Sequence, residues 1–287
     1  MIYDSVAVTM AQNYDRYLGP LFFYPYADDL VARLPVRPGV RVLEIACGTG
    51  IVTARLWNRL RGQGTLVATD LNESMLAYAQ TQVSPAAGLE WRKVDATNLP
   101  FPDVMFDAVV CEFGLMFFPD KAASAAEAFR VLQPGGHWLF NVWDAVEHNR
   151  IGALVHETVA AFFPTDPPQF FRAPFAYHDA PTITALLERA GFERIQWEYV
   201  EKTGTSPSAT DAATGLIDGA PIGAEIIARR ADAVPEIKAA VAAKIAAELG
   251  DPPVPIPLRA LVFSARRPAG GRHDTPRAAA DPGVNSG

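Results

Sequence analysis

The sequence has few cysteines and no long uninterrupted apolar run. Its 287 residues include two cysteines, Cys47 and Cys111, without Cys-x-x-Cys or Cys/His spacing. The absence of such spacing argues against a disulfide framework and against a structural zinc site. The most apolar region, 104–118, contains two acidic residues and a glycine, so it falls short of the roughly 18 apolar residues that a membrane-spanning helix needs. We therefore expect a cytoplasmic protein without a membrane span.

The chain also lacks an excess of positive charge. It has 25 Lys and Arg residues against 32 Asp and Glu residues, which is a formal net charge of −7. Because nucleic-acid binding rests largely on neutralising phosphates with cations, we expect no nucleic-acid partner. Hydrophobic residues make up 49% of the sequence, which is ordinary for a globular protein with a full-sized core. The composition is compatible with either a monomer or a homodimer.

Short apolar runs alternate with amphipathic segments along most of the chain, which is typical of an α/β protein with a parallel sheet covered by helices on both faces. Helices are expected near 51–60, 121–132, 151–163 and 181–190, with another opening at Asn72 and Glu73. Seven strands are expected near 41–46, 65–69, 89–94, 106–111, 137–142, 192–201 and 258–265.

The segment between the last two expected strands is far longer than the usual connection of roughly 4–6 residues. Ile237, Val241, Ile245 and Leu249 recur every four residues in it, which predicts a helical insertion at about 206–251. The apolar stripe is either core packing or the underside of a cover over a ligand site.

The strongest local signal is an apolar strand that runs into glycines, Val42-Leu-Glu-Ile-Ala-Cys-Gly-Thr-Gly50. Glycines allow backbone angles and close approaches that other residues cannot make, so a ligand can lie against this turn. Dinucleotide sites share such a turn before a helix, but their third glycine is Thr53 here. Glu44 inside the strand would repel a phosphate and suits a cationic ligand.

Two further acids follow the next two predicted strands. Asp70 falls 20 residues after Gly50, where a carboxylate can accept both hydroxyls of a ribose. Asp95 ends the third strand, where it can bind the exocyclic amine of an adenine held between Leu71 and Met75. Each acid alone is as readily a strand-end or cap residue. Together with Glu44, they describe a nucleoside with a positive centre and no phosphate.

These motifs resemble those of the class I S-adenosylmethionine-dependent methyltransferases, in particular the branch that contains the ubiquinone/menaquinone biosynthesis enzymes. The resemblance rests on residues 44–50, Asp70, Asp95-Ala96, Phe106-Asp107 and the turn 131–136. It implies a Rossmann-like seven-stranded sheet whose last strand is antiparallel. It also implies that the chain transfers a methyl group from its cofactor, S-adenosyl-L-methionine, to a small-molecule acceptor. Ala46 stands where the family pattern usually has glycine, a change of one methyl group.

By this resemblance, Gly48 and Gly50 would flank the methionine part of the cofactor, Asp70 the ribose and Asp95 the adenine. Glu112, with the residue that follows it, would border the methionyl end and the transferred methyl. The predicted cofactor-binding residues are Glu44, Ala46, Cys47, Gly48, Gly50, Asp70, Leu71, Met75, Asp95, Ala96, Glu112, Phe113 and Tyr14.

The segment that precedes the sheet, 1–36, is unusually aromatic. In the enzymes that the chain resembles, this segment folds over the cofactor, so Tyr14 and Tyr17 are candidate lid residues; an ordinary packing helix is the alternative. The methyltransferase domain would span 37–267. The end, 268–287, has one branched aliphatic residue and is expected to be a flexible tail, because it cannot offset the entropy of ordering.

Methyl transfer from a sulfonium is an in-line displacement, in which the protein mainly aligns the reactants and excludes water. An acceptor that must lose a proton also needs a base, for which Glu112, Asp144 and His148 are candidates. Glu112 can equally hold the cofactor's ammonium, and Asp144 can be a helix cap. A mostly apolar pocket for a planar or lipophilic acceptor is expected from the aromatic and apolar residues Tyr14, Tyr17, Phe113, Met116, Phe117, Trp143, Phe170 and Phe171.

Two other functions remain open at this point. An NAD(P)-dependent oxidoreductase is disfavoured by Glu44 and Thr53. A non-catalytic S-adenosylmethionine-binding regulatory protein would keep the same strand-end acids. No metal site is predicted, since no His/Asp pair has the spacing for a divalent ion. The acceptor atom, whether oxygen, nitrogen or carbon, does not follow from the cofactor motifs.

Overall fold

A computed structural model describes residues 9–270 of the chain; most of the predicted tail lies outside them. Its core is one seven-stranded sheet with the order β3-β2-β1-β4-β5-β7-β6. The strands β1 to β5 pair in parallel, and β7 runs antiparallel to both β5 and β6, which confirms the predicted fold. The strands are β1 (Val40–Ile45), β2 (Gly64–Asp70), β3 (Leu89–Lys93), β4 (Phe106–Glu112), β5 (Leu132–Trp143), β6 (Glu193–Ser206) and β7 (Val254–Arg266).

The helices follow the expected alternation with the strands. Asn72 and Asp179 cap two of them, each accepting backbone N–H groups of the first turn. The longer helices are the π-helix η1 (Tyr14–Phe23), α2 (Tyr24–Ala32), α3 (Ile51–Leu60), α4 (Glu73–Gln82), α5 (Lys121–Val131), α6 (Arg150–Ala160), α7 (Ala180–Arg189), α8 (Ala209–Asp218), α9 (Ile222–Arg230) and α10 (Val234–Leu249). Single 3₁₀ turns are η2 (Leu115–Phe117), η3 (Val146–His148), η4 (Phe170–Arg172) and η5 (Ala231–Ala233).

Two tryptophans of β5 mark the two covered faces of the sheet. Trp143 meets the ring of Tyr26 in α2 at 5.3 Å between centroids. Trp138 lies five residues earlier and therefore points to the opposite face, where it packs with Phe192. Phe192 in turn meets Phe129 of α5. Helices thus cover both faces, as predicted.

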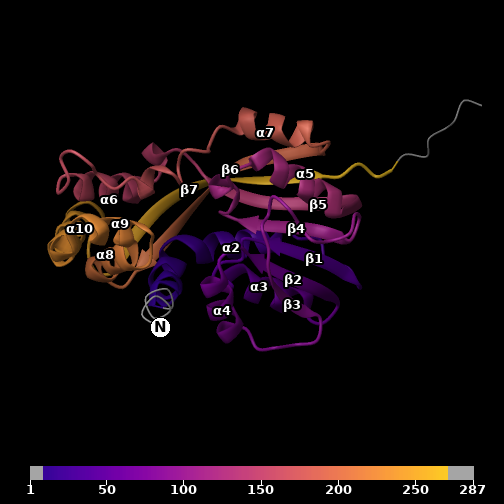
Figure 1. Ribbon diagram of the computed structural model, residues 1–287, viewed down its shortest axis with the longest axis horizontal. Helices are drawn as coiled ribbons and strands as arrows, with labels where there is room; N and C mark the ends of the chain where they lie inside the picture. Colours follow the sequence, from indigo (N-terminus) through magenta and orange to yellow (C-terminus); the bar gives the residue numbers. More distant parts are fainter. Residues whose placement is uncertain (1–8, 271–287) are drawn as a thin grey trace, which may run out of the picture.

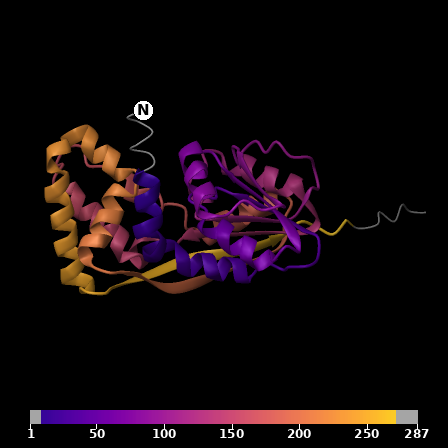
Figure 2. The same cartoon turned by 90° about the horizontal axis from the view of Figure 1, so that it is seen from below.

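The molecule is elongated, with the sheet towards one end and the helices α6, α8, α9 and α10 gathered at the other (Figure 1). The strands β6 and β7 run from the sheet to these helices, and the N-terminal helical segment lies between the two groups (Figure 2). The residues between β6 and β7 therefore form the predicted helical insertion. Ile237, Val241 and Ile245 of its apolar stripe are fully buried, whereas Leu249 is half-buried.

Both β6 and β7 extend further than predicted. Their pairing continues through Pro255 and Pro257, which lie in the additional part of β7. In this ladder, the backbone N–H of Arg259 points away from β6 and donates to the side chain of Asn149. Residues 255 and 257 share that orientation because strand residues alternate, so their missing N–H groups cost no hydrogen bond to β6. A proline-rich stretch can therefore continue the strand.

Close backbone contacts hold the N-terminal segment against this extension. A Cβ atom on Gly204 of β6 would lie 1.8 Å from the carbonyl oxygen of Leu21, and one on Gly215 of α8 would lie 2.5 Å from the Cβ of Tyr17. Only glycine permits these approaches. The helix η1 is thus packed between β6 and the insertion.

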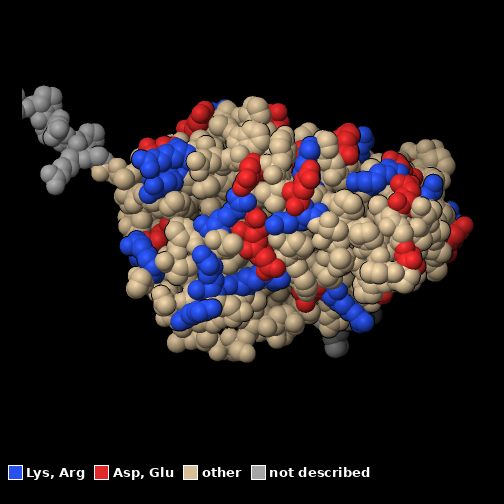
Figure 3. All heavy atoms as spheres, turned by 180° about the vertical axis from the view of Figure 1, so that it is seen from behind, with Lys and Arg blue, Asp and Glu red and all other residues tan. Residues whose placement is uncertain are grey.

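Charged side chains of both signs are interspersed over much of the face seen in Figure 3. That face carries no broad surface of a single sign. Within residues 9–270, no helix is both long and apolar enough to cross a membrane.

Candidate cofactor and acceptor site

The turn after β1 has the backbone geometry that its glycines predict. Ala46, Gly48 and Gly50 have φ angles of 56°, 55° and 86°, in the left-handed region that favours glycine. The N–H of Cys47 donates to Thr69 O of β2 at 2.9 Å. The turn is therefore anchored to the neighbouring strand, and it leads directly into α3.

A small cavity of about 30 Å³ lies at this turn. It brings together six of the predicted cofactor-binding residues, which come from η1, from β1 with its turn, and from β4: Tyr14, Glu44, Ala46, Cys47, Gly48 and Glu112. Phe23, Thr49, Ile51 and Val52 complete its wall. Three elements that are distant in sequence thus converge on one point.

Glu44 is buried at the floor of this cavity, with 1% of its surface exposed. The hydroxyl of Thr53 donates to its carboxyl group at 2.7 Å. Burial raises the pKa of Glu44 to about 8 because desolvation disfavours the charged form. The threonine at the third glycine position is therefore the hydrogen-bond partner of this acid.

Glu112, the last residue of β4, is a half-buried acid in the wall of the cavity. Its Oε1 atom is buried and has no hydrogen-bond partner among residues 9–270. Burial raises its pKa well above the usual value. A polar atom that is buried without a partner is rare and calls for a functional explanation.

Asp70 connects the glycine turn to the start of α4. Its two carboxylate oxygens accept the N–H groups of Gly48 and Asn72, each at 2.8 Å. Burial raises its pKa, although these hydrogen bonds act in the opposite direction. The side chain of the next residue, Leu71, is 64% exposed.

Asp95 also follows its strand end, as predicted. The N–H of Val94 donates to Asp70 O at 3.0 Å, which places Asp95 and Ala96 beside the end of β2. Asp95 is exposed, and its carboxylate accepts from the N–H and hydroxyl of Thr97, which lowers its pKa. Its side chain thus bonds within its own turn.

A larger, apolar cavity of about 290 Å³ adjoins the small one, since Tyr14 and Phe23 line both. Phe113 and Trp143 stack in its wall, with ring centroids 3.8 Å apart. Among the residues predicted for the acceptor pocket, it contains Tyr14, Phe113, Phe117, Trp143, Phe170 and Phe171, together with the predicted cofactor residue Met75. The other lining residues, not predicted individually, are Met10, Leu18, Phe22, Phe23, Asn72, Pro174, Phe175, Gly219, Ala220 and Pro221. The first four belong to the segment expected as a lid, and the last three belong to the insertion expected as a possible cover.

Tyr17 and Met116 do not line the apolar cavity. Tyr17 packs against Gly215 of α8, and Met116 is buried in the main core. Asn141 of β5 is a further residue that sequence reasoning missed: its buried side chain accepts the N–H of Phe113 at 2.8 Å. It fixes Phe113, whose φ angle is 48°.

Known proteins share both the sequence pattern and the fold. Residues 42–136 match the model of a methyltransferase domain family. The ubiquinone/menaquinone biosynthesis C-methyltransferase UbiE of Cronobacter sakazakii is 32% identical over 189 residues, which cover 59% of this chain and 72% of that protein. The chain belongs to the class I S-adenosylmethionine-dependent methyltransferases.

Solved structures of low identity share this methyltransferase fold. The phosphoethanolamine N-methyltransferase 2 of Haemonchus contortus, in complex with phosphomonomethylethanolamine and S-adenosylhomocysteine, has a TM-score of 0.59 and 18% identity and covers 90% of this chain and 57% of its own. The YcgJ protein of Bacillus subtilis has a TM-score of 0.55 and 16% identity, and the match covers 86% of this chain and 100% of the YcgJ chain. As a member of this family, the methyltransferase uses S-adenosyl-L-methionine, and the two alternative functions are not retained.

The residues of the small cavity fit a cofactor that carries a positive charge. The methionyl sulfonium is cationic, and the wall contains the two acids Glu44 and Glu112 and no basic side chain. Within residues 9–270, no group of three or more His, Cys, Asp or Glu side chains is arranged to hold a metal ion. The site thus offers an organic cation two acids that can ionise beside it, together with hydrogen-bond acceptors.

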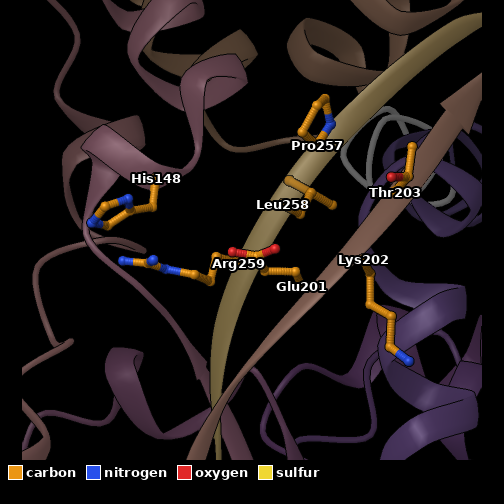
Figure 4. A pocket seen from close by; sticks show the side chains of 7 residues that line it. All are labelled: His148, Glu201, Lys202, Thr203, Pro257, Leu258 and Arg259. Carbon is orange, nitrogen blue, oxygen red and sulfur yellow. The ribbon is translucent and has the colours of Figure 1, made fainter.

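The structure does not bring Asp144 and His148 to either cavity of the methyltransferase. Asp144 is buried and forms an ion pair with Arg259 of β7; its side chain caps no helix. His148 lines a separate hollow of about 460 Å³ over β6 and β7, where its ring lies near the guanidinium of Arg259 and Glu201 is on the adjacent strand (Figure 4). Of the three candidate bases, Glu112 alone lies at the site.

The pKa of Glu44 predicts how the stability of the cofactor-free enzyme depends on pH. Unfolded glutamate titrates near 4.3, so between about pH 4.3 and pH 8 the folded chain holds a proton that the unfolded chain has lost. The unfolding free energy should therefore fall as pH rises through this window, by up to about 1.4 kcal/mol per pH unit from this group. Glu44→Gln should remove that share of the slope, as measured by urea denaturation at pH 5, 6, 7 and 8.

Glu127→Gln is the matched control for this experiment. The Arg130 guanidinium lowers the pKa of Glu127, so this acid is ionised in both states above pH 5 and its removal should leave the slope unchanged. Equal slopes for the wild type and Glu44→Gln would show that Glu44 is ionised in the folded chain.

Proposed function

We propose that this methyltransferase methylates a small, largely apolar or aromatic acceptor that binds in the 290 Å³ cavity. The observation that carries the proposal is the shared wall of the two cavities, at Tyr14 and Phe23. A cofactor held at the glycine turn would present its methyl group towards the apolar space. Aromatic walls with few polar groups favour a planar or lipophilic ligand over a peptide or nucleic acid.

The proposed cofactor contacts follow from the positions of the described residues. Glu44, Glu112 and the glycine turn would surround the methionyl end, because they form the small cavity. Asp70 would accept the ribose hydroxyls, since both of its oxygens keep lone pairs beyond the backbone N–H groups that they accept. Asp95 and Ala96 would border the adenine beside the end of β2.

The cofactor supplies a methyl group on a cationic sulfur, which leaves by in-line displacement. What the chain contributes is alignment and a dry site. The stacked rings of Phe113 and Trp143 give the acceptor a rigid apolar wall. Asn141 holds the backbone of Phe113, so this wall keeps a fixed distance from the end of β4.

The segment 9–36 would act as a lid, as the aromatic N-terminus suggests. The small cavity has roughly the volume of one water molecule in the liquid, so Tyr14 and Phe23 must move for a methionyl group to enter. The hydroxyl of Tyr78 in α4 donates to Asp15 of η1 at 3.1 Å, which would fasten this lid. The insertion forms part of the roof through Gly219, Ala220 and Pro221.

Transfer of a labelled methyl group tests the proposal directly. The enzyme would be incubated with methyl-labelled S-adenosylmethionine and with panels of quinols, phenols, aromatic amines and polar amines. The name of the Cronobacter sakazakii relative, a C-methyltransferase of ubiquinone/menaquinone biosynthesis, makes quinol ring carbons the first acceptors to try. We expect label in apolar aromatic products. Label only in polar aliphatic amines would contradict the assignment of the apolar cavity.

A further inference from the structure

Acidic and phenolic groups meet at the small cavity, and no basic side chain is among its lining residues in the described part of the chain. Glu44 has the Thr53 hydroxyl, and Asp70 has two backbone N–H groups. Glu112 differs from both, because its Oε1 atom is buried without any partner in the described chain. Tyr14 of η1 is half-buried and lines the same cavity, and its pKa is raised by burial and by Glu112.

The ionisable groups near Glu112 come from three elements, and two of the three are acidic. Glu44 of β1 and Asp28 of α2 oppose its ionisation, and Arg55 of α3 favours it. Arg55, however, is engaged elsewhere: its Nε donates to Asp28 at 2.5 Å and its Nη1 to Ile51 O at 2.9 Å, and it lies over the ring of Tyr24. Cys47, whose pKa is also raised by burial, brings no positive charge to the wall.

Ionising an acid that has one oxygen buried without a partner is costly, so the group keeps its proton until a cation arrives. The cofactor has one positive charge more than its demethylated product, because its sulfur is a sulfonium and the sulfur of S-adenosylhomocysteine is a neutral thioether. A sulfonium in the small cavity would supply the missing countercharge. The product keeps the α-ammonium of the methionyl end but carries no charge at sulfur, so it would lack the countercharge that the sulfonium places beside Glu112.

We propose that Glu112 makes the site discriminate the cationic cofactor from its neutral product, by releasing a proton when the cofactor binds and retaining it with the product. This inference rests on the proposed placement of the methionyl end at the small cavity. The proton balance is simple: the Glu112 carboxyl O–H breaks, its electron pair stays on the carboxylate, and the proton passes to the buffer. Near neutral pH, the group would favour cofactor over product and help the product to leave.

Calorimetric titration in buffers of different ionisation enthalpy measures this proton directly. The wild-type protein would be titrated at pH 7.0 with S-adenosylmethionine and, separately, with S-adenosylhomocysteine. The difference between the two proton counts is the readout, because contributions from the amino and carboxyl groups that both ligands share cancel. We expect about one more proton released with S-adenosylmethionine. We also expect its affinity to rise up to tenfold per pH unit relative to that of the product.

Glu112→Gln keeps the shape of the protonated acid and a hydrogen-bond donor. It should abolish the difference in released protons between S-adenosylmethionine and S-adenosylhomocysteine. Its affinity ratio of cofactor to product should lose the pH dependence of up to tenfold per pH unit that the wild type shows. Glu44→Gln is the matched control and should retain the difference. If Glu44→Gln released equal numbers of protons with the two ligands while Glu112→Gln did not, the proton would belong to Glu44, and the inference would be overturned.

The wild-type titration alone also decides the question if a variant fails to fold. Equal proton counts for the two ligands would overturn the inference while leaving the methyltransferase function intact. Failure of both ligands to bind a folded protein would instead overturn the proposed cofactor site, and the inference with it.

Discussion

Asp70→Ala is expected to weaken binding of both S-adenosylmethionine and S-adenosylhomocysteine by about 100-fold or more. The carboxylate holds the N–H groups of Gly48 and Asn72 at 2.8 Å, so its removal frees the glycine turn from the start of α4 and also deletes the proposed ribose contact. Hydrogen bonds to a charged group contribute about 1.5–3 kcal/mol each, and about 3 kcal/mol corresponds to more than a hundredfold in affinity. Isothermal titration measures the loss.

Asp179→Ala is a matched control for this variant. Asp179 also accepts a backbone N–H at the start of a helix, that of Thr182 at 2.9 Å, but α7 contributes no residue to either cavity. The loss of this cap should cost about 1 kcal/mol of stability and leave both affinities unchanged. Affinity of Asp70→Ala within twofold of wild type would remove Asp70 from the cofactor site.

Ala220→Phe is expected to reduce acceptor methylation by about 100-fold or more while leaving cofactor affinity within twofold of wild type. Ala220 is buried in the turn between α8 and α9 and lines the apolar cavity. A phenyl ring there would occupy space that the acceptor needs. Displacing a reactant by about 1 Å can already cost about 100-fold in rate. Steady-state kcat/KM for the acceptor and titration with S-adenosylmethionine separate the two effects.

Ala224→Phe tests whether the effect of Ala220→Phe depends on the position of the new ring. Ala224 is exposed on α9, so the added ring should leave both activity and cofactor affinity unchanged. Thermal unfolding of both variants controls for overpacking, which typically costs 1–3 kcal/mol. Full activity of a folded Ala220→Phe enzyme would place the acceptor outside the apolar cavity.

Much of the sheet and its helices could be predicted because their signals are local. The bounds of α3 are those expected from the sequence, since Gly50 precedes it in a left-handed conformation and the apolar residues follow helical spacing. The helix α7 begins at the Asp179 cap and is followed by Gly191 with a φ angle of 98°. In contrast, β6 and β7 were predicted too short, because their pairing partners lie about 50 residues apart.

The cofactor half of the candidate site was predictable for a related reason. In a parallel sheet, the carboxyl ends of neighbouring strands lie at one edge, so Glu44, Asp70 and Glu112 had to approach one another once the strands were identified. The base candidates Asp144 and His148 were not constrained in this way. Asp144 pairs with Arg259, 115 residues away, and nothing in its local sequence indicates that partner.

The strands, the glycine turn with its left-handed backbone, the acids at the strand ends and the family could all be predicted from local sequence. These depend on backbone angles, side-chain periodicity and short-range hydrogen bonds, which neighbouring residues specify. The position of Tyr14 and Phe23 between a small acidic cavity and an apolar one follows instead from tertiary packing. The same holds for the Oε1 atom of Glu112, which is buried without a partner among residues 9–270, because burial and pairing depend on which distant segments pack together.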